Sequence, residues 1–75
     1  MYYSLVGQNG NAFNLMGYTA NAMKDSGFTK DEIDKMYEEA KSGDYNNLLC
    51  VCSDYCDKCN EKMGYTEDDE EEEDY

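Results

Sequence analysis

Apolar residues recur at helical spacing from Asn11 onward, and three glycines divide this pattern into segments. The dividing glycines are Gly27, Gly43 and Gly64. Apolar side chains three and four residues apart lie on one face of a helix, and glycine is typical of the residue just past a helix end. Amphipathic helices of this length bury their apolar faces by packing against one another. The sequence therefore predicts a mainly α fold, with three helices packed as a small bundle.

Each predicted helix has a start signal and one apolar stripe. Asn9 or Asn11 can cap the first helix, Thr29 forms a capping box with Glu32 in the second, and Asp44 can cap the third. The predicted core of the first helix is Phe13, Met16, Ala20 and Met23, flanked by Leu15 and Ala22. In the second it is Ile33, Met36, Tyr37 and Ala40. In the third it is Leu48, Leu49, Cys52, Cys56, Cys59 and Met63, with Tyr45 and Tyr55 at the edges.

The first six residues, MYYSLV, are mostly aromatic, β-branched or apolar, and predict a short N-terminal strand. A lone strand must pair its backbone groups with something. Two partners remain open: a segment near Tyr65, or the same strand of a second copy. The protein is therefore expected to be a monomer, or a homodimer through this strand.

Residues 67–74 are eight consecutive acids, so two thirds of the net charge of −12 lies in this run. Such a run repels itself and has no apolar side chain to bury. We therefore expect one small domain over residues 1–65, followed by a disordered acidic tail over residues 66–75. The ten acids and six lysines before the tail leave a net charge of −4 there.

The composition disfavours most enzymes and direct readers of nucleic acid. The chain has no histidine and no arginine, which removes the commonest general base and the bidentate clamp for phosphate. A polyanion with scattered lysines lacks the cations that bind phosphates. We predict no catalytic residue, no cofactor and no direct binding of nucleic acid. No apolar stretch suits a membrane span and no signal peptide is visible, so a cytoplasmic protein is expected.

Four cysteines lie within ten residues in the pattern C-x-C-x3-C-x2-C, which raises the alternative of a small zinc module at residues 50–59. On a continuous helix Cys52, Cys56 and Cys59 share a face, whereas Cys50 points largely away. Structural zinc sites usually draw their ligands from separate turns. We therefore favour small buried hydrophobic side chains over a metal site.

Carboxylates and tyrosines are the candidate partner-binding residues. Acids recur at helical spacing in two of the predicted helices and continue in the tail: Asp31, Asp34, Glu38, Asp54, Asp57, Glu61, Glu67, Asp68, Asp69 and Glu70. The eight tyrosines exceed what a thin core can hold, and exposed tyrosine is a preferred interface anchor. Tyr37 and Tyr55 are the candidate anchors. For each helix taken alone, an ordinary solvated face explains the acids equally well, and the tail can serve solubility alone.

Two short segments carry a resemblance. Residues 6–13 (VGQNGNAF), followed by a helix with an Ala-Met pair, and residues 42–49 (SGDYNNLL) are similar to small proteins encoded by bacteriophages and mobile elements. The resemblance covers about residues 5–60 and leaves out the tail. It implies no site residue, since these motifs carry no catalytic signature. Small acidic phage proteins resemble anti-CRISPR and anti-restriction inhibitors, some of which imitate DNA.

The charge thus predicts a non-enzymatic protein that binds the basic surface of a nucleic-acid-binding protein. The resemblance implies that it is a phage-type inhibitor of a host defence protein in the bacterial cytosol, with a CRISPR effector as the first choice. An extended acidic chain has about the charge spacing of one nucleic-acid strand, which motivates mimicry. One rival function is sequestration of a nucleotide signal, which the negative charge opposes. The other rival is the zinc module.

Overall fold

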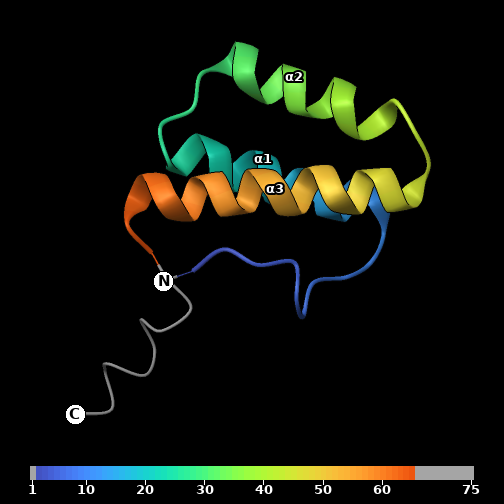
Figure 1. Cartoon of the computed structure of the whole chain (residues 1–75), viewed down its shortest axis with the longest axis horizontal. Helices are drawn as coiled ribbons and strands as arrows, with labels where there is room; N and C mark the ends of the chain where they lie inside the picture. The colour runs from blue at the N-terminus through green and yellow to red at the C-terminus, as the bar shows by residue number, and fades with distance from the viewer. Residues whose placement is uncertain (1, 66–75) are drawn as a thin grey trace.

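The computed structural model describes residues 2–65 and contains three helices in a bundle (Figure 1). These are α1 (Ala12–Asp25), α2 (Lys30–Lys41) and α3 (Tyr45–Met63), and each contacts the other two. The predicted mainly α, three-helix architecture is confirmed. The predicted acidic tail, residues 66–75, lies outside the described residues.

Local side-chain signals begin and end the helices as predicted. The Asn11 side chain accepts hydrogen bonds from the first-turn amides of α1, and Asp44 does the same for α3. Thr29 and Glu32 form both bonds of the capping box at α2. Gly64 follows α3 with φ at 77°, a left-handed conformation that favours glycine. Because each cap involves residues only a few positions apart, the caps fix where the helices begin and end without help from tertiary packing.

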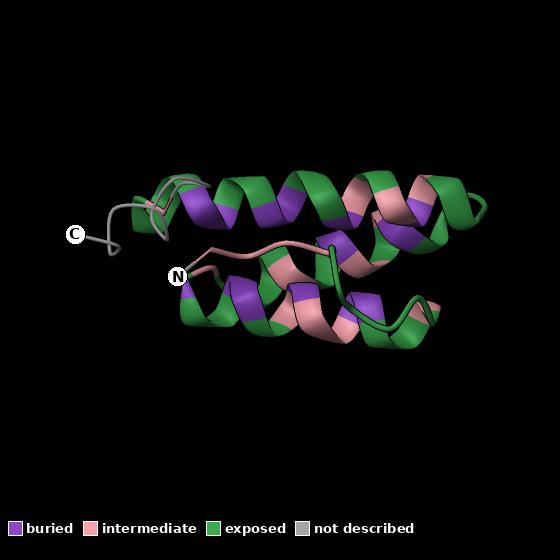
Figure 2. Cartoon of the chain, turned by 90° about the horizontal axis from the view of Figure 1, so that it is seen from below, coloured by how far each residue is buried: buried purple, intermediate pink, exposed green. Residues whose placement is uncertain are grey.

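The core lies where the three helices meet, and Figure 2 shows the buried faces turned toward one another. It consists of two clusters of buried residues. The first cluster is Leu15, Met16, Ala40, Leu48 and Cys52. The second cluster is Ala22, Met23, Met36, Tyr55 and Cys59. Thr19 is also fully buried, and its hydroxyl donates to the Leu15 carbonyl at 2.8 Å, which satisfies a polar group inside the bundle.

Two residues of the predicted core are exposed instead. Phe13 is 79% exposed and Met63 is 41% exposed. Phe13 lies in the first turn of α1 and Met63 in the last turn of α3, where a stripe continues beyond the packed part of the bundle. The apolar stripes were therefore predicted correctly in the middle of these helices and wrongly at the two ends.

The predicted N-terminal strand is not confirmed, because residues 2–6 form no strand. They run between α1 and α3, on the side of this helix pair opposite α2 (Figures 1 and 2). A turn begins at Leu5, whose C=O accepts the Gln8 N–H at 3.1 Å. The Asn60 side chain accepts from the Tyr3 backbone N–H at 2.7 Å and donates to its C=O at 2.8 Å. The Ser4 N–H donates to the Tyr18 hydroxyl at 3.0 Å.

Side chains of the helices thus supply the hydrogen bonds that a neighbouring strand was expected to provide. The expected partner near Tyr65 is present only as a ring contact, since the Tyr3 and Tyr65 ring centroids are 5.8 Å apart. Pairing with a second copy at Tyr3 requires both bonds to Asn60 to break. We name residues 2–6 the N-terminal strap.

Candidate partner-binding surface

The acids predicted on α2 lie on its outer face. Asp31, Asp34 and Glu38 are exposed, whereas Met36 and Ala40 on the opposite side are buried. The Asp34 carboxylate is 3.7 Å from the Lys30 ammonium, in an exposed pair one helical turn apart. Exposed pairs of this kind contribute little to stability, at most about 1 kcal/mol. The three carboxylates therefore remain available to a partner.

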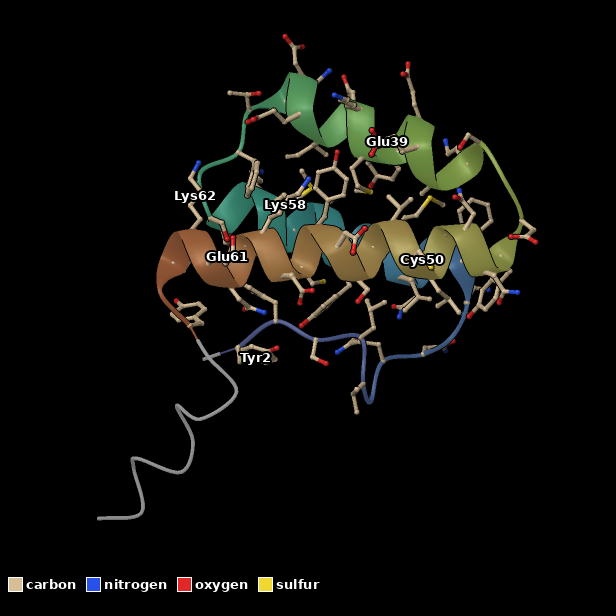
Figure 3. All side chains as sticks on the ribbon, in the orientation of Figure 1. Tyr2, Glu39, Cys50, Lys58, Glu61 and Lys62 are labelled. Atoms are coloured by element: carbon tan, nitrogen blue, oxygen red, sulfur yellow. The ribbon has the colours of Figure 1, made fainter. Side chains whose placement is uncertain are left out.

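The acids predicted on α3 are arranged in the same way. Asp54, Asp57 and Glu61 are exposed, and Figure 3 shows Glu61 on the outer side of the helix. The spacing is identical in the two helices: the second acid follows three residues after the first, and the third follows four residues after the second. Each helix thus presents one acidic stripe to solvent.

The fold does not merge these two stripes into one surface. A hollow of about 280 Å³ lies between α2 and α3, and it is lined by Phe28, Glu32, Lys35, Tyr55 and Lys58. Figure 3 shows the Lys58 side chain on the side of α3 that faces α2. The lysines of this seam separate the acidic stripe of α2 from that of α3. A partner that contacts both stripes must therefore span the seam or wrap around the bundle.

The two candidate tyrosines have different environments. Tyr55 is only 8% exposed; its hydroxyl donates to the Glu39 carboxylate at 3.0 Å, and the Lys58 ammonium lies 4.6 Å from its ring centroid. Burial raises the pKa of Tyr55, and the hydrogen bond to Glu39 adds to that shift. Tyr37 is half-buried and packs against both core clusters. The structure thus places Tyr55 in the core and leaves Tyr37 as the candidate anchor.

The remaining candidate acids, Glu67, Asp68, Asp69 and Glu70, lie outside the described residues. Within residues 2–65, the structure exposes three acids on each of two helices as two separate stripes and leaves Tyr37 half-buried. These six carboxylates and Tyr37 are the described part of the candidate surface.

The cysteines are placed as the helical spacing predicts: Cys50 is exposed, and Cys52, Cys56 and Cys59 are buried. Burial raises the pKa of each buried thiol, and that of Cys56 reaches about 11. These three groups are therefore protonated near pH 7, a form that is neither a good nucleophile nor a metal ligand. Residues 2–65 contain no group of three or more metal-ligating side chains arranged to hold an ion.

An apolar groove that the sequence did not predict lies near the start of α1 and α3. It has a volume of about 540 Å³ and is lined mainly by Ala12, Phe13, Met16, Tyr45 and Leu48. The Tyr45 hydroxyl donates to the Gly10 carbonyl at its rim. The groove was missed because the periodicity of α1 assigns Phe13 to the core. The one sequence feature that indicates an exposed Phe13 is its position in the first turn of the helix.

Comparison with known proteins gives no relative: no protein-family model, no curated protein and no solved structure matches this chain. In the part of the chain that the structure describes, none of the helices combines the length and apolar character needed to cross a membrane.

Proposed function

We propose that this protein is a non-enzymatic binding protein that presents carboxylates to the basic, nucleic-acid-binding surface of another protein. The observation that carries the proposal is the pair of matching acidic stripes on α2 and α3, all six carboxylates of which are exposed. A partner with clustered lysines and arginines complements such a surface, and complementary charge speeds association and selects the partner.

The charge density of the stripes compares with that of nucleic acid. In each stripe the first and third carboxylates are seven positions apart, which is about 10.5 Å of helix at 1.5 Å per residue, or one charge every 5 Å or so. One nucleic-acid strand carries a phosphate about every 3.4 Å. Each stripe thus has about two thirds of the charge density of a strand. The eight consecutive acids of residues 67–74 raise the charge density of the whole chain toward that of a nucleic-acid strand.

The chemistry of the interior supports a binding role over a catalytic one. The buried thiols are held in the protonated form by burial, which raises their pKa values. The chain offers no histidine as a general base and no arginine to stabilise a developing negative charge. The exposed groups on the two stripes are carboxylates, which contribute negative charge to the binding of a partner.

The proposed partner is a protein that processes nucleic acid, and a bacterial CRISPR effector is the first one to test. Such effectors hold nucleic acid in a positively charged channel. Occupation of that channel by the acidic surface gives inhibition by competition. This mode of action is that of a phage-type inhibitor of host defence, acting as a nucleic-acid mimic.

The test is a competition assay with a purified CRISPR effector and a labelled single-stranded DNA that it binds. We expect the protein to displace the DNA. The two stripes are then neutralised separately by Asp31→Asn/Asp34→Asn/Glu38→Gln and Asp54→Asn/Asp57→Asn/Glu61→Gln. Each triple variant is expected to compete at least tenfold more weakly.

The control is Asp25→Asn, which removes one negative charge at an exposed position off the two stripes. It is expected to compete within a factor of three of the unmodified protein. Equal competition by the unmodified protein and both triple variants contradicts a role for the stripes. Failure of the unmodified protein to bind the effector at any salt concentration excludes this partner.

A further inference from the structure

Five of the six lysines of the chain gather around one phenylalanine, although they are spread over 39 positions of the sequence. Lys24 and Lys30 line a hollow of about 400 Å³ with Phe28 and Ile33. Lys35 and Lys58 line the neighbouring hollow with Phe28. The Lys62 ammonium lies 4.6 Å from the Phe28 ring centroid. We name these residues the Phe28 lysine patch: Lys24, Phe28, Lys30, Lys35, Lys58 and Lys62.

The patch forms because three helix ends meet at one end of the bundle (Figure 1). Lys24 lies in the last turn of α1, Lys30 begins α2, and Lys62 lies in the last turn of α3. The sixth lysine, Lys41, lies at the opposite end of α2, where its ammonium is 5.5 Å from the Tyr37 ring centroid. The two ends of the bundle therefore differ in their content of cations.

Most of the positive charge in the patch is not neutralised by neighbouring carboxylates. Lys30 pairs with Asp34 at 3.7 Å. Within residues 2–65, the other four lysines of the patch have no carboxylate at ion-pair distance. Glu32 lines the same hollow, and its carboxylate accepts the Thr29 N–H at 2.8 Å as part of the helix cap. That hydrogen bond lowers the pKa of Glu32, and the charge of Lys62 adds to the shift, although the two groups are not at ion-pair distance. The Lys62 ammonium faces the Phe28 ring and the Lys58 ammonium faces the Tyr55 ring. This end of the bundle thus carries cations without a paired carboxylate in a protein whose net charge is −12.

We propose that the acidic run of the same chain, residues 67–74, binds the Phe28 lysine patch. The charges are complementary, and a separate polyanion is repelled by the net charge of the protein. The described chain ends at Tyr65, whose N–H donates to the Asn60 carbonyl, beside the last turn of α3. The ten following residues reach up to about 33 Å when extended, and the two turns of α3 that carry Lys58 and Lys62 span about 11 Å.

Covalent connection favours this occupant over any anion in solution. A short flexible connection gives the attached segment an effective concentration in the millimolar range. Bound there, the acidic run covers the only lysine-rich end of the described bundle and turns its carboxylates inward. A basic partner then competes with the patch for these carboxylates. This contact within the chain goes beyond the proposed function, and its test does not depend on the identity of any partner.

A spin label at the end of the full chain tests the contact. The label is attached to Tyr75→Cys in a Cys50→Ser background, in which the three remaining native cysteines are buried. Amide signals are then recorded by nuclear magnetic resonance on the isotope-labelled protein. We expect the label to reduce signal intensity at least twofold in residues 24–35 and 58–63, and to leave residues 41–45 unchanged. Because the attraction is ionic, 0.5 M NaCl is expected to restore the intensities.

Charge variants of the full chain provide the matched comparison. Lys35→Gln/Lys58→Gln/Lys62→Gln is expected to restore the intensities at least twofold, and Lys41→Gln to change nothing. Signal loss spread evenly over both ends of the bundle, or loss that persists in 0.5 M NaCl, overturns the proposal. In a mixture of isotope-labelled chains with separately spin-labelled chains, loss at the patch assigns the acidic run to a second copy and also overturns it.

Discussion

Replacement of Asn60 by alanine is expected to release the N-terminal strap. The Asn60 side chain is 4% exposed, and it makes hydrogen bonds with both the N–H and the C=O of Tyr3. Each bond contributes about 1 kcal/mol net, and the partly buried groups left unpaired raise the loss to about 2–3 kcal/mol. Alanine recovers about 0.5 kcal/mol through its higher helix propensity. The net destabilisation is therefore about 2 kcal/mol.

In a domain of this size, 1 kcal/mol corresponds to about 4–8 °C in Tm, so Asn60→Ala is expected to lower Tm by about 8–16 °C. The assay is thermal and urea unfolding followed by circular dichroism, together with hydrogen exchange of the Tyr3 amide. The control is Asn46→Ala, which changes an exposed asparagine of the same helix and is expected to leave Tm equal or slightly higher. An unchanged Tm for Asn60→Ala, with undiminished protection of the Tyr3 amide, would refute this account of the strap.

Four further predictions concern the cysteines, the helix cap and the buried against the exposed apolar residues. At pH 8 a thiol reagent is expected to modify Cys50 alone, and all four cysteines in urea. Because burial raises the pKa of Cys56 from 9.0 to about 11, the folded state retains a proton that the unfolded thiol loses. The contribution of the protonated Cys56 thiol to stability is complete below about pH 9 and falls as the pH rises toward 11. The midpoint of urea unfolding is therefore expected to drop between these pH values. In Cys56→Ala this drop is expected to be smaller. Thr29→Ala removes the capping box and is expected to cost about 1 kcal/mol in urea unfolding; a change below 0.3 kcal/mol or so contradicts the cap geometry. Phe13→Ser is expected to change stability by at most about 0.5 kcal/mol and Met23→Ala to cost about 2–5 kcal/mol, and the reverse order contradicts the observed burial.

Features that depend on neighbouring residues were predictable from the sequence. The capping box at Thr29 and Glu32 involves residues three positions apart, and the helical spacing of Cys52, Cys56 and Cys59 already places them on one face. Three helices and most of their buried faces follow from such local patterns. The acids of α2 and α3 were likewise predictable as outward groups, because they lie opposite the apolar stripes.

Features that depend on distant residues were not predictable in the same way. The strap was predicted as a strand because its composition favours one, yet its backbone is paired by Asn60, 57 residues further along the chain. Nothing local to Tyr3 signals that partner. The lysines around Phe28 lie on three helices, and only the packing of the helix ends brings them together. The burial of Thr19 was not predicted, because a polar side chain is expected at the surface. Here its hydroxyl donates a hydrogen bond to the Leu15 carbonyl, which allows it to be buried.

The salt dependence of partner binding tests the central claim most directly. The affinity of the full chain for a protein partner is measured over a series of NaCl concentrations, with and without neutralisation of the six carboxylates on α2 and α3. We predict that the logarithm of the binding constant falls linearly with the logarithm of salt concentration, and that the slope becomes shallower in the neutralised variant. Affinity that is independent of both salt and the six carboxylates would contradict a function based on the presentation of negative charge.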